Sequence, residues 1–225
     1  ECRKRPSMGC STHGHGFVVL GVVVLKNFRF NLMLMIACLL LWPALAFAAP
    51  LRVAQVPVLA RVYCPGEVVE SLEQQVRLAT HVPLNGYLQI VEYLPSRDIM
   101  EVLGEVQRGE AGKPQYKEML RPLARRLEAD MVVLPVLTGY RQWQHMSWRR
   151  GLIEHCYASV DLYVYDSRTD EVIKKSASRF YDDESSARGS APLMAREAMD
   201  DALRASRLHE RIYPSKEARM QQAAS

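Results

Sequence analysis

Histidine and cysteine side chains gather in one stretch of the chain, where His145, His155 and Cys156 lie close in sequence. With His81 they would supply the ligands that zinc prefers, but their spacing matches no compact ligand pattern and includes no Cys-x-x-Cys pair. If residues 155 and 156 belong to one strand, their side chains point to opposite faces, which argues against Cys156 as a histidine-activated nucleophile. No Gly-rich phosphate loop or carboxylate pair stands out either. The sequence therefore predicts no metal site, no cofactor and no catalytic residue.

The cysteines offer a second kind of chemistry, because Cys64 and Cys156 are the two that remain if an N-terminal leader is removed. An apolar strand ends shortly before Cys64, and Cys156 opens a strand that should run antiparallel to its neighbour. Both cysteines then arrive at the same edge of the sheet, where a disulfide needs Cα atoms within about 7 Å. Two alternatives follow: a Cys64–Cys156 disulfide formed in an oxidising compartment, or a buried core thiol at Cys156.

Tryptophan and arginine are concentrated at residues 141–150, in the run Arg-Gln-Trp-Gln-His-Met-Ser-Trp-Arg-Arg. These two residue types are enriched at the hot spots of protein interfaces. The alternative is a long connecting hairpin whose tryptophans fold back onto the core while the arginines stay solvated. A tyrosine row, Tyr157, Tyr163 and Tyr165, is a second candidate, although such a row is more simply covered by a helix, for example the Ala-rich last one. The candidate interface comprises Arg141, Trp143, His145, Trp148, Arg149 and Arg150.

The elements that must position these residues are clearest over residues 156–181. Alternate residues at 156–164 form an apolar row and those at 157–165 a polar or amphipathic one, which is typical of a strand with one face on a core. A cluster of turn-forming residues follows at 166–170, and the chain returns as a second β-rich run at 171–181. The sequence predicts a β-hairpin here.

The remaining elements follow from hydrophobic periodicity and from Pro, Gly and Asn signals. Right-handed crossovers would make the first three strands parallel, with the hairpin strands antiparallel at one side. The prediction is an α/β fold, a single-domain sandwich with a mixed sheet of about five strands packed by helices, in the order β-α-β-α-α-β-β-β-α. The expected strands before the hairpin are 51–59, 87–94 and 131–140, and the expected helices are 67–80, one beginning at 96, 116–127 and 192–212.

Net charge argues against a nucleic-acid partner. The 225-residue chain has a formal charge of +4, but five of its 29 basic residues and one of its 25 acidic residues lie in residues 1–48. This leaves 24 of each from residue 49 onward, so that part of the chain is neutral and lacks the basic excess that phosphate binding requires.

Residues 1–48 have the pattern of an N-terminal extension followed by a secretory signal peptide. Lys26 and Arg29 supply a positive region, residues 32–48 are uncharged, and Ala-Phe-Ala at 46–48 fits a cleavage site. The alternative is a retained membrane anchor, because the uncharged segment is just long enough to span a bilayer. Cleavage and export would place the remaining chain in the periplasm or another extracytoplasmic space.

Three stretches carry a resemblance to a known group of proteins. They are the opening strand at 53–59 with its following helix, the helix-to-strand passage at 120–136, and the hairpin turn Tyr-Asp-Ser-Arg-Thr-Asp-Glu-Val-Ile at 165–173. They resemble bacterial envelope domains related to the curli secretion channel protein CsgG, the penicillin-binding-protein activator LpoB and the N-terminal domain of TolB. The turn is similar to that group's Asp-x-x-Thr-Gly-Glu pattern, with Asp170 in place of Gly, since Asp tolerates left-handed backbone geometry. The resemblance covers roughly residues 51–212, and it implies a non-catalytic envelope protein that binds other proteins or helps an assembly form.

The sequence thus favours a non-catalytic exported cell-envelope protein, a protein-binding or assembly accessory module. Residues 49–213 would form its domain, and residues 214–225 a disordered tail. The expected partner is another envelope protein; a homo-oligomer is compatible with the sequence, and membrane contact is expected only through an uncleaved leader. That leader would give a membrane-anchored form of the same module. The alternative class is an exported hydrolase-type enzyme with a site assembled from dispersed residues, which a deep pocket with converging polar groups would reveal.

Overall fold

The computed structural model describes residues 50–109, 115–184, 186 and 189–213. The expected leader and tail lie outside these residues. The described strands are β1 (Leu51–Gln55), β2 (Leu59–Ala60), β3 (Val91–Tyr93), β4 (Met131–Ser147), β5 (Gly151–Asp166) and β6 (Glu171–Glu184). The described helices are α2 (Gly66–Thr80), α3 (Asn85–Leu88), α4 (Ser96–Gly109), α5 (Tyr116–Leu127), α6 (Ala191–Ser206) and α7 (Leu208–Ile212).

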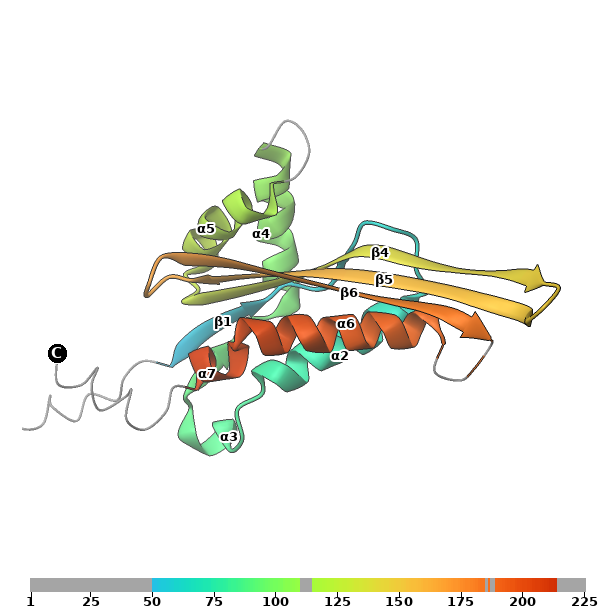
Figure 1. Ribbon diagram of the computed structural model, residues 1–225. Helices are drawn as coiled ribbons and strands as arrows, with labels where there is room; N and C mark the ends of the chain where they lie inside the picture. The colour runs from blue at the N-terminus through green and yellow to red at the C-terminus, as the bar shows by residue number, and fades with distance from the viewer. Residues whose placement is uncertain (1–49, 110–114, 185, 187–188, 214–225) are drawn as a thin grey trace, which may run out of the picture. The chain divides into compact units, whose positions relative to one another are not determined.

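The described strands form one mixed sheet in the spatial order β3-β1-β4-β5-β6, with β2 paired to β4. Figure 1 labels β1, β4, β5 and β6 of this sheet. β1 runs parallel to β3 and β4, whereas β4, β5 and β6 are antiparallel. The predicted α/β sandwich, its parallel first strands and its antiparallel hairpin are therefore confirmed. At the hairpin turn Asp170 has a φ of 50°, the left-handed geometry expected at the Gly position of the Asp-x-x-Thr-Gly-Glu pattern.

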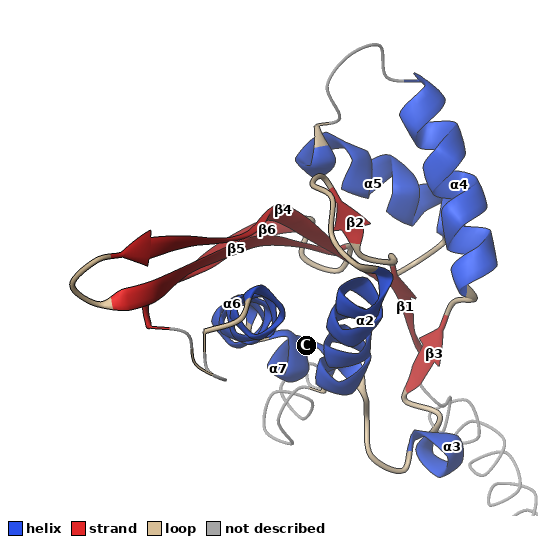
Figure 2. Cartoon of the chain, turned by 90° about the vertical axis from the view of Figure 1, so that its right-hand side faces the viewer, coloured by secondary structure: helices blue, strands red, loops and turns tan. Residues whose placement is uncertain are grey.

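Helices lie on both sides of the sheet, with α2, α6 and α7 on one side and α4 and α5 on the other (Figure 2). The apolar row of β5 at 156–164 shares a core cluster with Ala195, Ala198 and Met199 of α6. The second core cluster joins α4 and α5 to alternate residues of β4. Because Ala side chains are small, α6 can lie close to the strand that it covers.

The helices that pack on the tyrosine row are not the predicted ones. Tyr163 and Tyr165 belong to the core cluster under α4 and α5, and the ring of Tyr116 at the start of α5 lies 5.6 Å from that of Tyr163. The last helix cannot cover these tyrosines because it already covers the alternate residues of β5, which point to the opposite face.

Two predicted strands are shorter than expected. The segment 87–94 contains the end of α3 and only a short β3, because the Asn85 side chain bridges to Val91, donating to its carbonyl at 2.7 Å and accepting from its N–H at 2.9 Å. The segment 51–59 is divided into β1 and β2 around Pro57, because proline has no N–H to donate to a neighbouring strand. Pro135 falls where β1 stops pairing with β4 and β2 begins, so no ladder donor is needed there.

The predicted last helix and the predicted connector after β4 also need correction. The helix ends at Ser206, because Arg207 adopts a φ of 50°, and α7 follows as a separate turn. Residues 141–147 are not a connector, since β4 continues to Ser147 in register with β5. A bulge between Leu137 and Gly139 precedes this extension. Gly139 is required there, because a Cβ would lie 2.6 Å from the Tyr157 ring.

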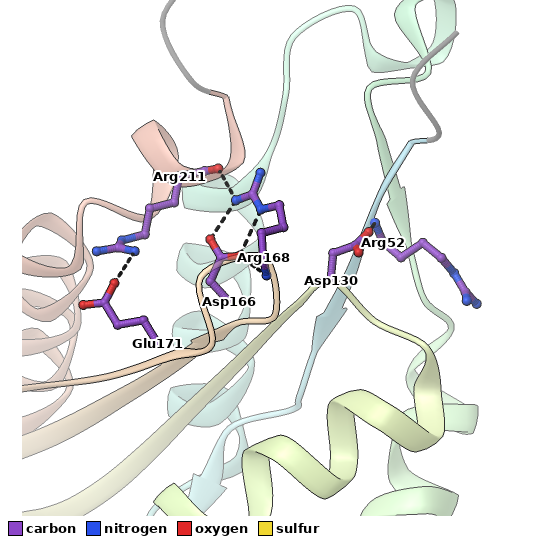
Figure 3. A network of polar contacts seen from close by, with 6 residues as sticks. All are labelled: Arg52, Asp130, Asp166, Arg168, Glu171 and Arg211. Carbon is purple, nitrogen blue, oxygen red and sulfur yellow. Dashed lines mark hydrogen bonds and ion pairs between the residues drawn. The ribbon is translucent and has the colours of Figure 1, made fainter. Parts of the chain in front are cut away.

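A polar network holds the turn between β5 and β6 against α7 (Figure 3). Asp166 is buried and accepts hydrogen bonds from Arg168 Nε at 2.9 Å, Arg168 Nη2 at 2.7 Å and the Arg168 backbone N–H at 3.1 Å. Arg168 Nη2 also donates to the Arg211 carbonyl at 3.0 Å, and the Arg211 guanidinium donates to Glu171 at 3.2 Å. The hydrogen bond to Asp166 raises the pKa of Arg168, so the guanidinium is held firmly in its charged form.

Asp130 joins this turn to β1. Its carboxylate accepts the Arg52 backbone N–H at 2.8 Å, and its carbonyl accepts the Ser167 N–H at 2.8 Å. The starts of β1 and β4 and the β5–β6 turn are thus linked through one residue.

Among the described residues, no helix combines the length and the apolar composition that crossing a bilayer requires.

Candidate functional site

The distal part of the β4–β5–β6 ribbon, here called the arm, consists of residues 139–147 of β4, the turn 148–150, residues 151–157 of β5 and residues 180–184 of β6. β4 has 17 residues and spans roughly 55 Å, whereas α6 has 16 residues and spans about 24 Å. Figure 1 shows the distal ends of these strands beyond the end of α6. Exposed residues on such an extension do not serve the core of their own chain, so they are candidates for contact with another molecule.

Stacked rings order three side chains on one face of the arm. Register places Trp143 opposite His155, and His155 opposite Asp182. The ring centroids of Trp143 and His155 lie 5.0 Å apart, with an interplanar angle of 8°. The centroid of the His145 ring lies 4.7 Å from that of His155, with an interplanar angle of 20°. His155 Nε2 is 2.7 Å from His145 Nδ1, and His155 Nδ1 is 3.2 Å from Asp182 Oδ1. Contacts at both nitrogens hold the His155 ring, which in turn supports the Trp143 ring from one side.

Large apolar side chains of the arm are open to solvent. Trp148 is 96% exposed, Met146 74%, Phe180 58% and Trp143 46%. Neither tryptophan belongs to the two core clusters, so the alternative in which both fold back onto the core is wrong. Their role as an interface stays a prediction.

Charge adds to this surface. Arg150 forms an ion pair with Asp183, and Asp182 is engaged by His155. In the described part of the chain Arg141 and Arg149 form no ion pair, so the arm combines cationic groups that lack a carboxylate partner with exposed tryptophans. The structure thereby places all the predicted interface residues, Arg141 to Arg150, on the arm.

Contacts with the start of α6 anchor the arm on its opposite face. Gln142 donates to the buried Glu154, and the Ala191 N–H donates to Gln142 Oε1 at 3.3 Å. Cys156 Sγ donates to the Gly189 carbonyl at 3.3 Å. Because neighbouring residues alternate, these anchoring side chains leave the face with the stacked rings uncovered.

The two cysteines approach a common neighbour but are free thiols in this structure. Cys156 is fully buried and Cys64 is half-buried, and burial raises the pKa of both thiols. Burial also raises the pKa of Tyr140, which Cys64 and Cys156 raise further. Both cysteines therefore lie within electrostatic reach of one phenol, and the disulfide stays a prediction.

We expect the exported protein, denatured without reductant, to show no reactive thiol from this pair, and both thiols after reduction. The cross-link would close a long loop and stabilise the fold by roughly 4–5 kcal/mol in the entropic description. The control is Cys64→Ser, which should show the single Cys156 thiol with or without reductant. Two reactive thiols in the unreduced wild-type protein would contradict the bridge.

The other histidine considered for zinc lies elsewhere. His81 follows α2 and lines a groove of about 830 Å³ between α2, α6 and α7, where Leu78, Leu203 and Leu208 supply apolar surface. The polar residues that line this groove include His81, Asp200, His209 and Glu210. In the described ranges no three His, Cys, Asp or Glu side chains are grouped so that they could hold a metal ion.

Asp161 organises a polar cluster across β5 and β6. Its carboxylate contacts Lys174 Nζ at 2.8 Å and accepts hydrogen bonds from Ser176 at 2.6 Å and Tyr163 at 3.3 Å. Burial raises the pKa of Asp161, but these donors outweigh burial and leave that pKa lowered. The hydrogen bond to Asp161 raises the pKa of Lys174. Each charged group is satisfied by the neighbouring strand, so the cluster joins strands and offers no reactive group.

Neither a protein-family model nor a curated protein sequence matches the chain. Solved structures do. The chain is similar to the hypothetical protein CT253 from Chlamydia trachomatis, at 14% identity over 74% of this chain and 100% of that one, with a TM-score of 0.45. It is similar to lipoprotein GNA1162 from Neisseria meningitidis, at 17% identity over 62% of this chain and 89% of that one, with a TM-score of 0.36. It is also similar to the LpoB C-terminal domain from Salmonella enterica, at 12% identity over 60% of this chain and 84% of that one, with a TM-score of 0.32.

The LpoB C-terminal domain, which belongs to the group that the sequence resembles, is thus among the solved structures to which this chain is similar. At these identities the similarity concerns the fold alone.

Sequence reasoning missed several residues of the arm. His155 was weighed only as a metal ligand or as the base for Cys156, and the predicted hairpin ended at residue 181, although β6 continues to Glu184. Phe180 and Met146 were not singled out. Extending the hairpin register outward from the turn at 166–170 would have found the pairing, because it places residue 182 opposite residue 155.

Proposed function

We propose that this chain is an exported, non-catalytic protein of the cell envelope, which binds a protein partner through its arm as an accessory to an envelope assembly. The observation that carries the proposal is the Trp143 stack and the exposed Trp148, held on strands that extend beyond α6. Ordered aromatic rings beside arginines are the residues that contribute most binding energy at interfaces, because they bury much area at little entropic cost.

The secretory pattern at residues 1–48 supports the location. The neutral charge of the remaining chain supports a protein rather than a nucleic acid as the partner. A hydrolase-type function has less support, because the groove at α2, α6 and α7 has leucines in its lining and its Asp200 carboxylate is ion-paired with Arg204.

Site-specific photo-crosslinking in intact cells tests this proposal. A photoreactive amino acid at position 148 should form a covalent adduct with one extracytoplasmic protein, because this side chain projects from the end of the arm. The matched control places the same group at Glu70, an exposed position of α2, where no adduct is expected. No adduct from position 148, equal adducts from both positions, or recovery of the chain in the cytoplasm would overturn the proposal.

A further inference from the structure

Along the arm, no described strand pairs with one edge of β4. On this side β1 pairs with Met131–Val133, β2 pairs with Val136–Leu137, and the Arg61 N–H donates to the Leu137 carbonyl at 3.0 Å. From Gly139 to Ser147 the paired neighbour of β4 is β5, on the other side. The sheet could therefore accept another strand here, in line with β2.

The backbone groups that such a strand would use can be assigned from the register. The Val133 and Leu137 carbonyls accept hydrogen bonds on the side of β1 and β2, so alternate residues present their backbone groups to that side. The bulge between Leu137 and Gly139 shifts this alternation by one residue. Tyr140, Gln142, Gln144 and Met146 then present their N–H and C=O groups to the open edge, and none of these groups bonds to another described backbone group on that side.

The opposite edge of the sheet is different. β6 also has no strand beyond it among those described, but its sequence is rich in charge along its length, which discourages pairing with another chain. The charged residues of β6 are Glu171, Lys174, Lys175, Arg179, Asp182, Asp183 and Glu184. The open stretch of β4 has a single arginine, Arg141, and one histidine. Of the two edges, β4 has the weaker protection.

A hollow of about 640 Å³ lies beside this edge and would receive side chains of an added strand. It is formed by the loop after β2 and by the first residues of the open edge, with Tyr63 93% exposed. Tyr140 and Trp143 give it aromatic surface, and Arg141 gives it positive charge. An unpaired edge and an adjoining hollow are two separate features that favour the same kind of ligand, an extended peptide.

We propose that an extended segment of the partner protein, bearing acidic residues, adds as a strand to β4 at Tyr140–Met146 and places a side chain in the hollow. The inference rests on the proposed function and specifies its contact. The acidic character follows from charge complementarity, because Arg141 and Arg149 flank the edge without carboxylate partners in the described residues, while the aspartates of the arm are already paired.

The probe is a phage-displayed library of random dodecapeptides, selected on the protein purified from cells that export it. Selected peptides should be enriched in Asp and Glu alternating with apolar residues. Gln144→Pro removes one outward N–H and should weaken the binding of a selected peptide by about tenfold or more, whereas Gln144→Ala keeps that N–H and should change it less than about twofold. Arg141→Gln should weaken binding severalfold and reduce its dependence on salt.

Hydrogen exchange provides a readout that does not depend on the folding of a proline variant. A bound peptide should protect the amides of Tyr140, Gln142, Gln144 and Met146 in the wild-type protein. Absence of this protection, equal binding by Gln144→Pro and Gln144→Ala, or selected peptides without acidic residues would overturn the proposal. A wild-type dimer in light scattering that Gln144→Pro converts to a monomer would also overturn it, in favour of a second copy at the edge. If the adduct at position 148 persists in any of these cases, binding by the arm stands and only strand addition fails.

Discussion

Replacing Arg168 with alanine should lower the free energy of unfolding by about 3–5 kcal/mol. Asp166 is 3% exposed, and its carboxylate depends on the Arg168 guanidinium for two of its hydrogen bonds. Without that group a buried negative charge keeps the backbone N–H of residue 168 but loses its cationic partner. The loss also frees the Arg211 carbonyl, so α7 keeps its Arg211–Glu171 ion pair but loses its hydrogen bond to the hairpin turn. Equilibrium denaturation in urea, followed by circular dichroism, measures the change.

Replacing the other partner of this ion pair, Asp166, should lower the free energy of unfolding by less. In Asp166→Asn the Arg168 side chain, which is 37% exposed, can turn toward water, so we expect a loss of about 1.5–3 kcal/mol. The matched control is Asp183→Ala, which removes an ion pair exposed on both sides and should change stability by less than about 1 kcal/mol. If Arg168→Ala proved no more destabilising than Asp183→Ala, the network in Figure 3 would not hold the turn.

Periodicity was sufficient for most of the fold because the buried faces of its elements are apolar. The alternation at 156–164 located the strand under α6, and the periodic leucines at 116–127 located α5 within its observed bounds. The prediction failed at 87–94, where β-forming residues are overridden by a side-chain bridge from Asn85 that no local propensity reports. It also failed for the cover of Tyr163, because alternation separates the two faces without saying which helix lies on each.

The candidate site was harder to predict than the core for a physical reason. Residues 141–147 carry polar side chains on both faces of β4, so no apolar row distinguishes a strand from a connector. What makes them a strand is pairing with β5, which begins directly after the turn at 148–150. Composition alone drew attention to the tryptophans and arginines. The stack on His155 and the open edge of β4 could be predicted only with knowledge of how β4 pairs with β5.

The double substitution Trp143→Ala with Trp148→Ala should abolish partner capture while leaving thermal stability near that of the wild-type protein. Interface tryptophans commonly contribute 2 kcal/mol or more each, so losing both would weaken binding by about a thousandfold. Stability should change by less than about 1 kcal/mol, because Trp148 is 96% exposed and Trp143 is outside both core clusters. His155 keeps its contacts with His145 and Asp182 after the ring of Trp143 is removed, so the strand pairing of the arm is retained.

Tyr87→Ala is the matched control for this double substitution, since Tyr87 is an aromatic residue 91% exposed on α3 and outside the arm. It should leave both the thermal midpoint and the adduct formed by the arm unchanged. A photoreactive group at Met146, which is 74% exposed on the arm, reports capture in all three proteins without altering either tryptophan. If the double variant unfolded at a much lower temperature, the tryptophans would be structural. If it kept both its midpoint and its adduct, the partner would be held by the arm without them, and the aromatic face would lose its assigned role.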